Sequence, residues 1–167
     1  TTPPYVVIIT GLSGSGKTTA IRALEDCGFF CIDNLPVPLL PKVLELAAGR
    51  ANEQSLALVI DTREREFLDD AVGMVDRLRT SDVHVQLLFL EADDQELVRR
   101  FSETRRRHPM ANGDTIREAI SRERDRLSEL REAADAIVDT SEHTPHTLGS
   151  LIEERFAGEE PTHFSVT

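Results

Sequence analysis

The clearest chemical signature in the sequence lies at positions 11–18, Gly-Leu-Ser-Gly-Ser-Gly-Lys-Thr. These residues match the pattern Gly-x-x-x-x-Gly-Lys-Thr, in which a glycine-rich turn directs several backbone N–H groups at one anion. Side chains at the glycine positions would obstruct the approach of that anion. The pattern therefore predicts a loop that cradles the phosphates of a nucleoside triphosphate, held together with Mg²⁺.

The polar residues of this loop have separate expected roles. Lys17 reaches the β and γ phosphate oxygens, and Thr18 offers its hydroxyl to Mg²⁺. The residues expected to bind the nucleotide are Gly11, Ser13, Gly14, Ser15, Gly16, Lys17, Thr18 and Thr19. The alternative is an ordinary glycine-rich turn, which would leave the lysine and the hydroxyl without a reason.

Two aspartates follow apolar runs, where a parallel sheet places its ligands. Asp61 closes the run 55–60, and Asp33 closes the run that begins at residue 29. We assign Asp61, with Thr18, to the metal and its bound water, and Asp33 to the attacking or acceptor side. Either aspartate could instead simply begin a turn. Asp139 follows a later run, and we interpret it as a turn residue.

Residues 99–107 carry five arginines against one glutamate in an acidic chain. Arginine binds phosphate oxygens in a bidentate manner, so this segment is a candidate lid over bound nucleotide. The alternative is a solvated helix face, which suits Arg99 and Arg100 better than the later arginines. The candidate catalytic residues are Lys17, Asp33, Asp61 and Arg105.

Apolar runs and helical spacing alternate along the chain. The runs 5–10, 29–33, 55–60, 83–90 and 136–140 predict strands, and the first of them ends at the glycine-rich loop. Helical patterns separate the strands, and Asp93 and Asp114 are expected to cap two of these helices. The alternation predicts an α/β fold of the P-loop NTPase type, with a five-stranded parallel sheet and helices on both faces.

Composition limits the partners. The 167 residues carry a net charge of -11, which argues against non-specific binding of nucleic acid. Cys27 and Cys31 lack the further ligands of a zinc site, and no apolar run is long enough for a bilayer. We therefore expect a cytoplasmic protein with no membrane contact.

Residues 1–158 are predicted to form one nucleotide-binding domain, and residues 159–167 a linker and the start of a missing carboxy-terminal domain.

Four stretches resemble the RapZ/YvcJ family of bacterial nucleotide-binding proteins and RNase adapters. They are the phosphate loop 11–18, Leu-Glu-Asp-Cys-Gly-Phe-Phe-Cys-Ile-Asp-Asn-Leu-Pro at 24–36, Val-Ile-Asp-Thr-Arg at 59–63, and 88–109. The resemblance implies a fold similar to nucleotide and gluconate kinases, ATP and GTP binding, and weak hydrolysis. It also implies that RNA and an endonuclease are partners only through the full-length protein. The loop and Asp61 match the family by position.

Three functions remain open from the sequence. The first is a regulatory module whose ATP or GTP state biases a partner domain, with slow hydrolysis. The second is a kinase for a small metabolite, with Asp33 as general base and residues 105–107 closing over the transferred phosphate. The third is a protein-interaction domain with a relic loop, which the intact Lys17, Thr18 and Asp61 argue against.

Overall fold

The structure is a computed structural model that describes residues 5–48, 55–62, 65–80, 84–104 and 115–157. Its elements, in chain order, are β1 (Tyr5–Gly11), α1 (Lys17–Asp26), β2 (Phe30–Pro36), the 3-10 helix η1 (Val37–Leu39), α2 (Leu40–Ala48), β3 (Leu56–Asp61), α3 (Arg65–Arg79), β4 (His84–Glu91), α4 (Asp94–Thr104), α5 (Ile116–Arg126), α6 (Ser128–Ala133), β5 (Ala136–Asp139) and α7 (Pro145–Ala157). The expected tail 159–167 lies outside the described residues.

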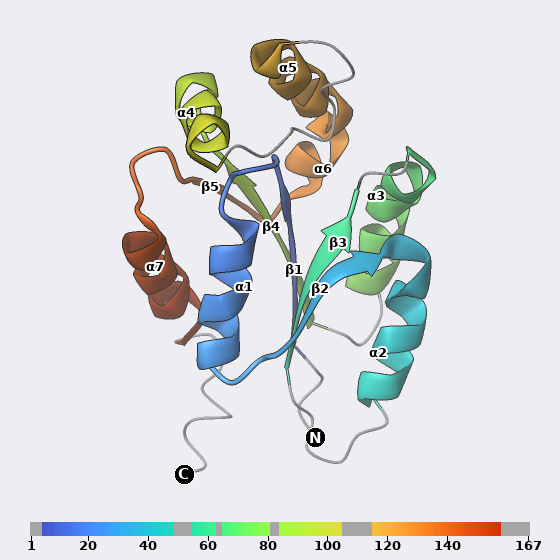
Figure 1. The fold of residues 1–167 in the computed structure, drawn as a ribbon. Helices are drawn as coiled ribbons and strands as arrows, with labels where there is room; N and C mark the ends of the chain where they lie inside the picture. The colour runs from blue at the N-terminus through green and yellow to red at the C-terminus, as the bar shows by residue number, and fades with distance from the viewer. Residues whose placement is uncertain (1–4, 49–54, 63–64, 81–83, 105–114, 158–167) are drawn as a thin grey trace.

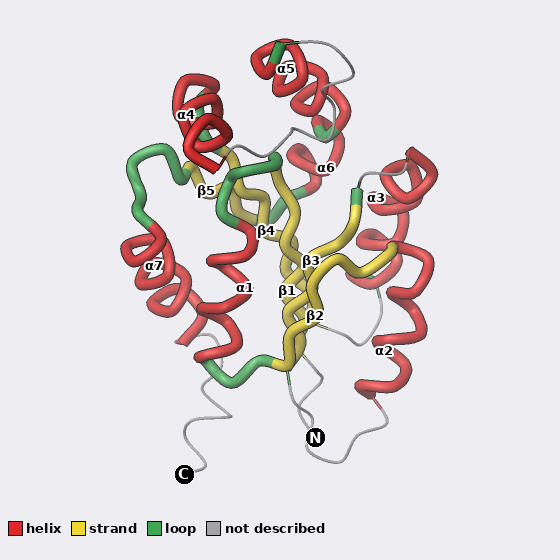
Figure 2. The backbone as a smooth tube through the Cα atoms, in the orientation of Figure 1, coloured by secondary structure: helices red, strands yellow, loops and turns green. Residues whose placement is uncertain are grey.

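The five strands form one parallel sheet in the order β2-β3-β1-β4-β5. The order places β1 at the centre, so the carboxyl ends of β3 and β4 flank the loop that follows β1. That loop lies at the upper edge of the sheet in Figure 2, between β1 and α1. The predicted fold class is confirmed, because all strand pairs are parallel and helices cover both faces (Figure 1).

The central strands are buried on both faces, which explains why β1 and β3 are almost continuously apolar. Side chains of β1 alternate between two hydrophobic clusters: Val6 and Ile8 join one, and Val7 and Ile9 join the other. The first cluster includes residues of α2, α3, α5 and α6, and the second includes residues of α1 and α7. Both helical layers therefore hold the central strand, and with it the loop, in one position.

Helix boundaries differ from the sequence pattern in one region. The spacing of Ile116, Ile120, Leu127 and Leu130 predicts a single helix, but the helix breaks at Leu127 between α5 and α6. The N-cap of α5 is Thr115, whose side chain accepts the N–H of Glu118. Asp114, the expected cap, lies outside the described residues.

Other boundaries follow the expected chemistry. The side chain of Asp93 accepts the N–H of Glu96 at 2.8 Å and so caps α4, as predicted.

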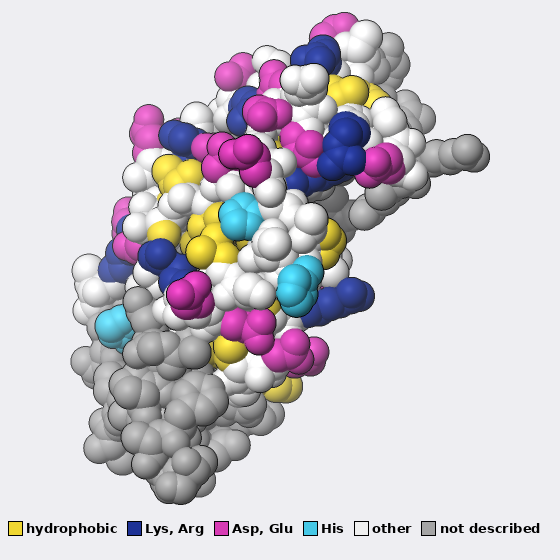
Figure 3. Space-filling model, turned by 90° about the vertical axis from the view of Figure 1, so that its left-hand side faces the viewer, with side chains coloured by type: hydrophobic (Ala, Val, Ile, Leu, Met, Phe, Trp, Pro, Cys, Tyr) yellow, Lys and Arg dark blue, Asp and Glu magenta, His cyan; other side chains and the backbone are white. Residues whose placement is uncertain are grey.

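In the described ranges, no helix is long and apolar enough to cross a membrane. Figure 3 shows the face that carries α4 and α7, where acidic and basic side chains are interspersed.

Candidate functional site

Close approach of two strands requires glycine at the start of the loop. Gly11 has φ +147, and a Cβ there would lie 2.2 Å from the carbonyl oxygen of Leu90 on β4. Leu12 N–H donates to the same oxygen at 3.1 Å, which closes the turn against β4. A side chain at position 11 would therefore push the loop away from the sheet.

The loop delivers the chain into the amino terminus of α1. Gly16 is the N-cap with φ 110, and in this part of the described chain no side chain caps the helix and no acidic residue stands in its first turn. The first N–H groups of a helix and its dipole favour an anion at this end. The Nζ of Lys17 donates to the carbonyl oxygens of Gly11 at 2.7 Å and Leu12 at 3.3 Å.

A buried carboxylate contacts the same loop. Glu123 of α5 is 8% exposed and accepts two hydrogen bonds from Ser13, one from the backbone N–H at 2.9 Å and one from the hydroxyl at 2.7 Å. Glu123 is not among the site residues predicted from the sequence. Its signal was the position, because Glu123 falls between Ile120 and Leu127 on the apolar face of the predicted helix, where a charge needs a partner.

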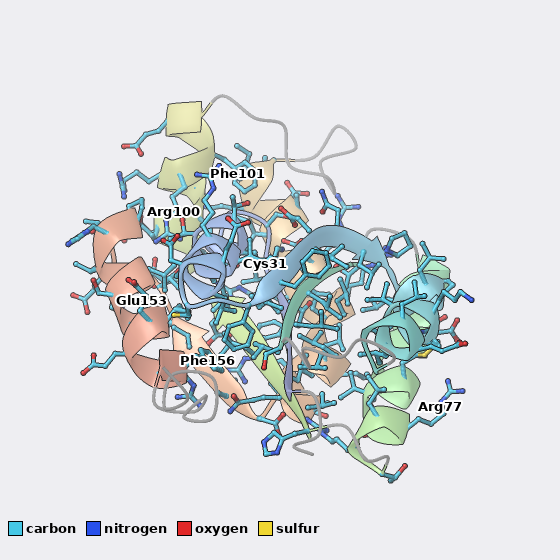
Figure 4. All side chains as sticks on the ribbon, turned by 90° about the horizontal axis from the view of Figure 1, so that it is seen from below. Cys31, Arg77, Arg100, Phe101, Glu153 and Phe156 are labelled. Atoms are coloured by element: carbon cyan, nitrogen blue, oxygen red, sulfur yellow. The ribbon has the colours of Figure 1, made fainter. Side chains whose placement is uncertain are left out.

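Arg100 joins the loop to the end of β5. Its guanidinium donates to Gly14 O at 2.9 Å and to Thr140 O at 2.6 Å, and it pairs with Glu96 at 2.9 Å. Figure 4 shows Arg100 and Phe101 on α4, whereas Arg77 lies at the periphery on α3. Hydrogen bonds from Arg99 and Arg100 hold the pKa of Glu96 below its usual range. Arg100 therefore supports the loop, a role that sequence reasoning did not assign.

Thr140 is the second member of this network. Its hydroxyl donates to Ser15 O at 2.7 Å and accepts from Arg100 Nη1 at 3.1 Å, and the residue is 1% exposed. Asp139, the residue before it, ends β5, and its side chain accepts the N–H of Ser141 at 2.9 Å, so it begins the turn that follows the strand. Hydrogen bonds from Ser141 lower the pKa of Asp139.

Replacing Thr140 by valine should destabilise the protein by about 1–3 kcal/mol, because Ser15 O and Arg100 lose a buried hydroxyl partner. Urea unfolding of both proteins measures the difference. Thr80→Val is the matched control, since its hydroxyl donates to Arg77 O at 2.8 Å on an exposed surface. Equal losses in the two variants would contradict the role given to Thr140.

The loop faces a cavity of about 750 Å³ at the carboxyl edge of the sheet. One side of the cavity is formed after β5 and by the start of α7, with His143, Thr144, Pro145 and Leu148. The other side is lined by polar residues within β2, after β3 and on α5: Asp33, Asn34, Thr62, Glu123 and Arg126. The volume suits a molecule of nucleotide size.

A bulge in β2 presents the predicted acceptor-side residue. The register between β2 and β3 shifts between Ile32 and Leu35, and Asn34 adopts a left-handed conformation with φ 56. Bulges redirect side chains and are frequent beside active sites. The sequence predicted that Asp33 ends its strand, but β2 continues to Pro36. Asp33 is instead exposed within this bulge and lines the cavity.

The remaining predicted residues fall in and around the loop. Ser13, Gly14, Ser15, Gly16, Lys17, Thr18 and Thr19 all line the cavity. The Oγ of Ser15 is buried and has no hydrogen-bond partner among the described residues. Asp61 is the last residue of β3, and its side chain lies outside the described part of the structure, as does the whole of Arg105.

The residues present fit a magnesium ion held through nucleotide phosphates. Thr18 is exposed in the first turn of α1, and β3 runs beside β1 so that Asp61 ends at the same edge. Among the described residues, no three His, Cys, Asp or Glu side chains gather as a metal site. Mg²⁺ does not require such a cluster, because it is commonly bound by one or two protein ligands, phosphates and water.

The strand order, the glycine loop and the cavity define a fold of the P-loop NTPase type. Shikimate kinase from Bacteroides thetaiotaomicron superposes with a TM-score of 0.61 at 16% identity, covering 93% of this chain and 98% of that one. Shikimate kinase from Acinetobacter baumannii, solved in complex with shikimate, gives 0.58 at 18% identity, covering 95% and 96%. At these identities the likeness shows the fold alone.

Sequence comparison then gives the family. The model of the RapZ-like N-terminal domain matches residues 5–160, and the chain belongs to this family. It is 55% identical over 154 residues to a nucleotide-binding protein of Myxococcus xanthus, covering 92% of this chain and 53% of that protein. A nucleotide-binding protein of Anaeromyxobacter is 49% identical, with 98% and 56% covered. The chain spans about half the length of the curated relatives it matches.

Proposed function

We propose that this chain is a regulatory domain that binds a nucleoside triphosphate, ATP or GTP, with Mg²⁺ and hydrolyses it slowly. The observation that carries the proposal is the glycine loop between β1 and α1, which opens onto a cavity of about 750 Å³ with Lys17 among its lining residues. The names of the relatives as nucleotide-binding proteins support it.

The site residues have defined roles in this proposal. The amino terminus of α1 attracts the phosphates, and Lys17 exchanges the carbonyl oxygens of Gly11 and Leu12 for phosphate oxygens. Thr18 and Asp61 would hold Mg²⁺, which when bound supplies charge that stabilises the phosphates. Gly14 and Gly16, with the hydroxyls of Ser13, Ser15 and Thr19, complete the loop.

The two sides of the cavity suit the two ends of a nucleotide. Pro145 and Leu148 offer apolar contact for a base, and the exposed Thr144 offers polar groups nearby. The opposite side carries Asp33 and Asn34, which suit the terminal phosphate and whatever attacks it. We therefore place the base on the β5 side and the reacting end on the β2 side.

Slow hydrolysis follows from how Arg99 and Arg100, the two arginines of α4 that line the cavity, are engaged. Arg99 pairs with Glu96 and with Glu103 at 2.7 Å, and Arg100 binds Glu96 and the loop carbonyl of Gly14. Phosphoryl transfer is accelerated by positive groups placed on the transition state. Arginines held by carboxylates and carbonyls are poorly placed for that task.

The second candidate function is a small-molecule kinase. Asp33, exposed on the β2 bulge, favours it because a carboxylate at the reacting end can accept a proton from an acceptor hydroxyl. Arg105 would then close over the transferred phosphate. For the regulatory reading, a carboxy-terminal domain is the direct partner, and RNA and an endonuclease are partners only of the full-length protein.

The fate of a labelled γ-phosphate distinguishes the two. We expect slow release of label to water from ATP and from GTP, at a rate that a pool of cell metabolites leaves unchanged, with Lys17→Ala as the blank. Transfer of the label to one metabolite would instead establish a kinase and make Asp33 catalytic. A wild-type rate equal to the Lys17→Ala blank would contradict hydrolysis altogether.

A further inference from the structure

Glu123 places a negative charge directly on the phosphate loop. Both carboxylate oxygens accept from one residue, Oε1 from the Ser13 N–H at 2.9 Å and Oε2 from the Ser13 hydroxyl at 2.7 Å. The two residues are 110 positions apart in sequence, and the contact joins α5 to the loop. A carboxylate that is only 8% exposed is costly to bury unless such partners hold it.

The position of this contact matters for a bound nucleotide. Ser13 lies inside the loop whose N–H groups bind phosphate, and both Ser13 and Glu123 line the cavity. Glu123 belongs to the side with Asp33, Asn34 and Thr62, on which we place the reacting end of the nucleotide. In the proposed orientation of the nucleotide, the carboxylate of Glu123 would lie beside the terminal phosphate.

We propose that Glu123 is a specificity-determining residue that opposes the terminal phosphate and so sets the preference between nucleoside tri- and diphosphates. This inference rests on the proposed function. Two anions at one loop repel each other in a partly buried site, so a γ-phosphate binds only when Glu123 leaves Ser13. A diphosphate, which ends one phosphate earlier, leaves the contact in place.

The same contact links the nucleotide state to the rest of the fold. Glu123 sits in the middle of α5, and α5 continues through Leu127 into α6, which packs in the cluster that covers one face of the sheet. Release of Glu123 by a triphosphate therefore acts on α5, whereas a diphosphate does not. That difference is what a regulatory domain needs to report which nucleotide it holds.

A different role, in which Glu123 holds an attacking water, predicts the opposite response to mutation. The geometry favours opposition to the phosphate, because each oxygen of the carboxylate accepts a hydrogen bond from Ser13, within the phosphate loop itself. Glutamine at this position tests the charge alone. Its side-chain oxygen still accepts from the Ser13 N–H, and its amide still bonds the hydroxyl, so the contact is kept without the negative charge.

The experiment measures the dissociation constants of Mg-ATP and Mg-ADP, and of Mg-GTP and Mg-GDP, for the wild-type chain and Glu123→Gln. We expect the variant to bind the triphosphate about tenfold more tightly, which corresponds to about 1.4 kcal/mol, with little change for the diphosphate. Glu153→Gln is the matched control, since it removes one charge from an exposed residue of α7 (Figure 4). We expect it to change neither constant.

Other results of these measurements would contradict the role proposed for Glu123 or the proposed function. Equal changes for tri- and diphosphate, or no change, would overturn the inference and leave the proposed function intact. Weaker triphosphate binding would overturn it in favour of a role on the metal. Slower release of labelled γ-phosphate by Glu123→Gln with unchanged binding would overturn it in favour of a role on the attacking water. Absence of nucleotide binding by the wild type and the variant alike would refute the proposed function and this inference together.

Discussion

Alanine in place of Gly11 is expected to lower the free energy of unfolding by about 3–5 kcal/mol, a large share of the stability of a domain of this size. The methyl group would lie 2.2 Å from the carbonyl oxygen of Leu90, and that oxygen is backbone in a buried strand. The cost combines a left-handed residue with overpacking against atoms that cannot turn away. Urea unfolding followed by circular dichroism measures it.

Two other glycines serve as controls for this prediction. Gly28 has φ +97 but nothing within 4 Å of a new Cβ, so Gly28→Ala should cost only the conformational term of about 1–2 kcal/mol. Gly149 lies inside α7 with open space around it, so Gly149→Ala should stabilise by about 0.5–1 kcal/mol. If Gly11→Ala costs no more than Gly28→Ala, close packing of β1 on β4 does not explain the glycine.

The second large effect concerns nucleotide binding. Mg-nucleotide at about one hundred times its dissociation constant should raise the free energy of unfolding of the wild type by ~2.7 kcal/mol. Lys17→Ala should abolish most of this gain, because it removes the ammonium group that is expected to bind the β- and γ-phosphate oxygens. Thermal unfolding with and without nucleotide measures the gain for each protein.

The chain offers a matched control for the lysine, since Lys17 and Lys42 are its only two lysines. Lys42 is exposed on α2, away from the residues that line the cavity. Lys42→Ala should therefore keep the full nucleotide-induced gain. Absence of any gain in the wild type would refute both the regulatory and the kinase function, whereas equal gains in wild type and Lys17→Ala would remove the lysine from the site.

Local patterns in the sequence determined the phosphate loop and the fold class. The spacing of glycines and Lys17 is contained in eight consecutive residues, and apolar runs alternate with helical periods along the whole chain. Such short-range signals also gave the cap at Asp93 and the turn at Asp139. The five parallel strands follow from them, since alternating strands and helices pack in few other ways.

Contacts between distant segments were decided only by the tertiary structure. The need for glycine at position 11 depends on Leu90, and the support of the loop depends on Arg100 and Thr140, which come from α4 and the end of β5. Glu123 reaches Ser13 across 110 residues. Periodicity predicts that a side chain faces the core. Which side chain it contacts there depends on the strand order and on how the helices pack. The sequence by itself therefore determined the phosphate loop and the fold class, and the tertiary structure decided which residues hold the loop in place.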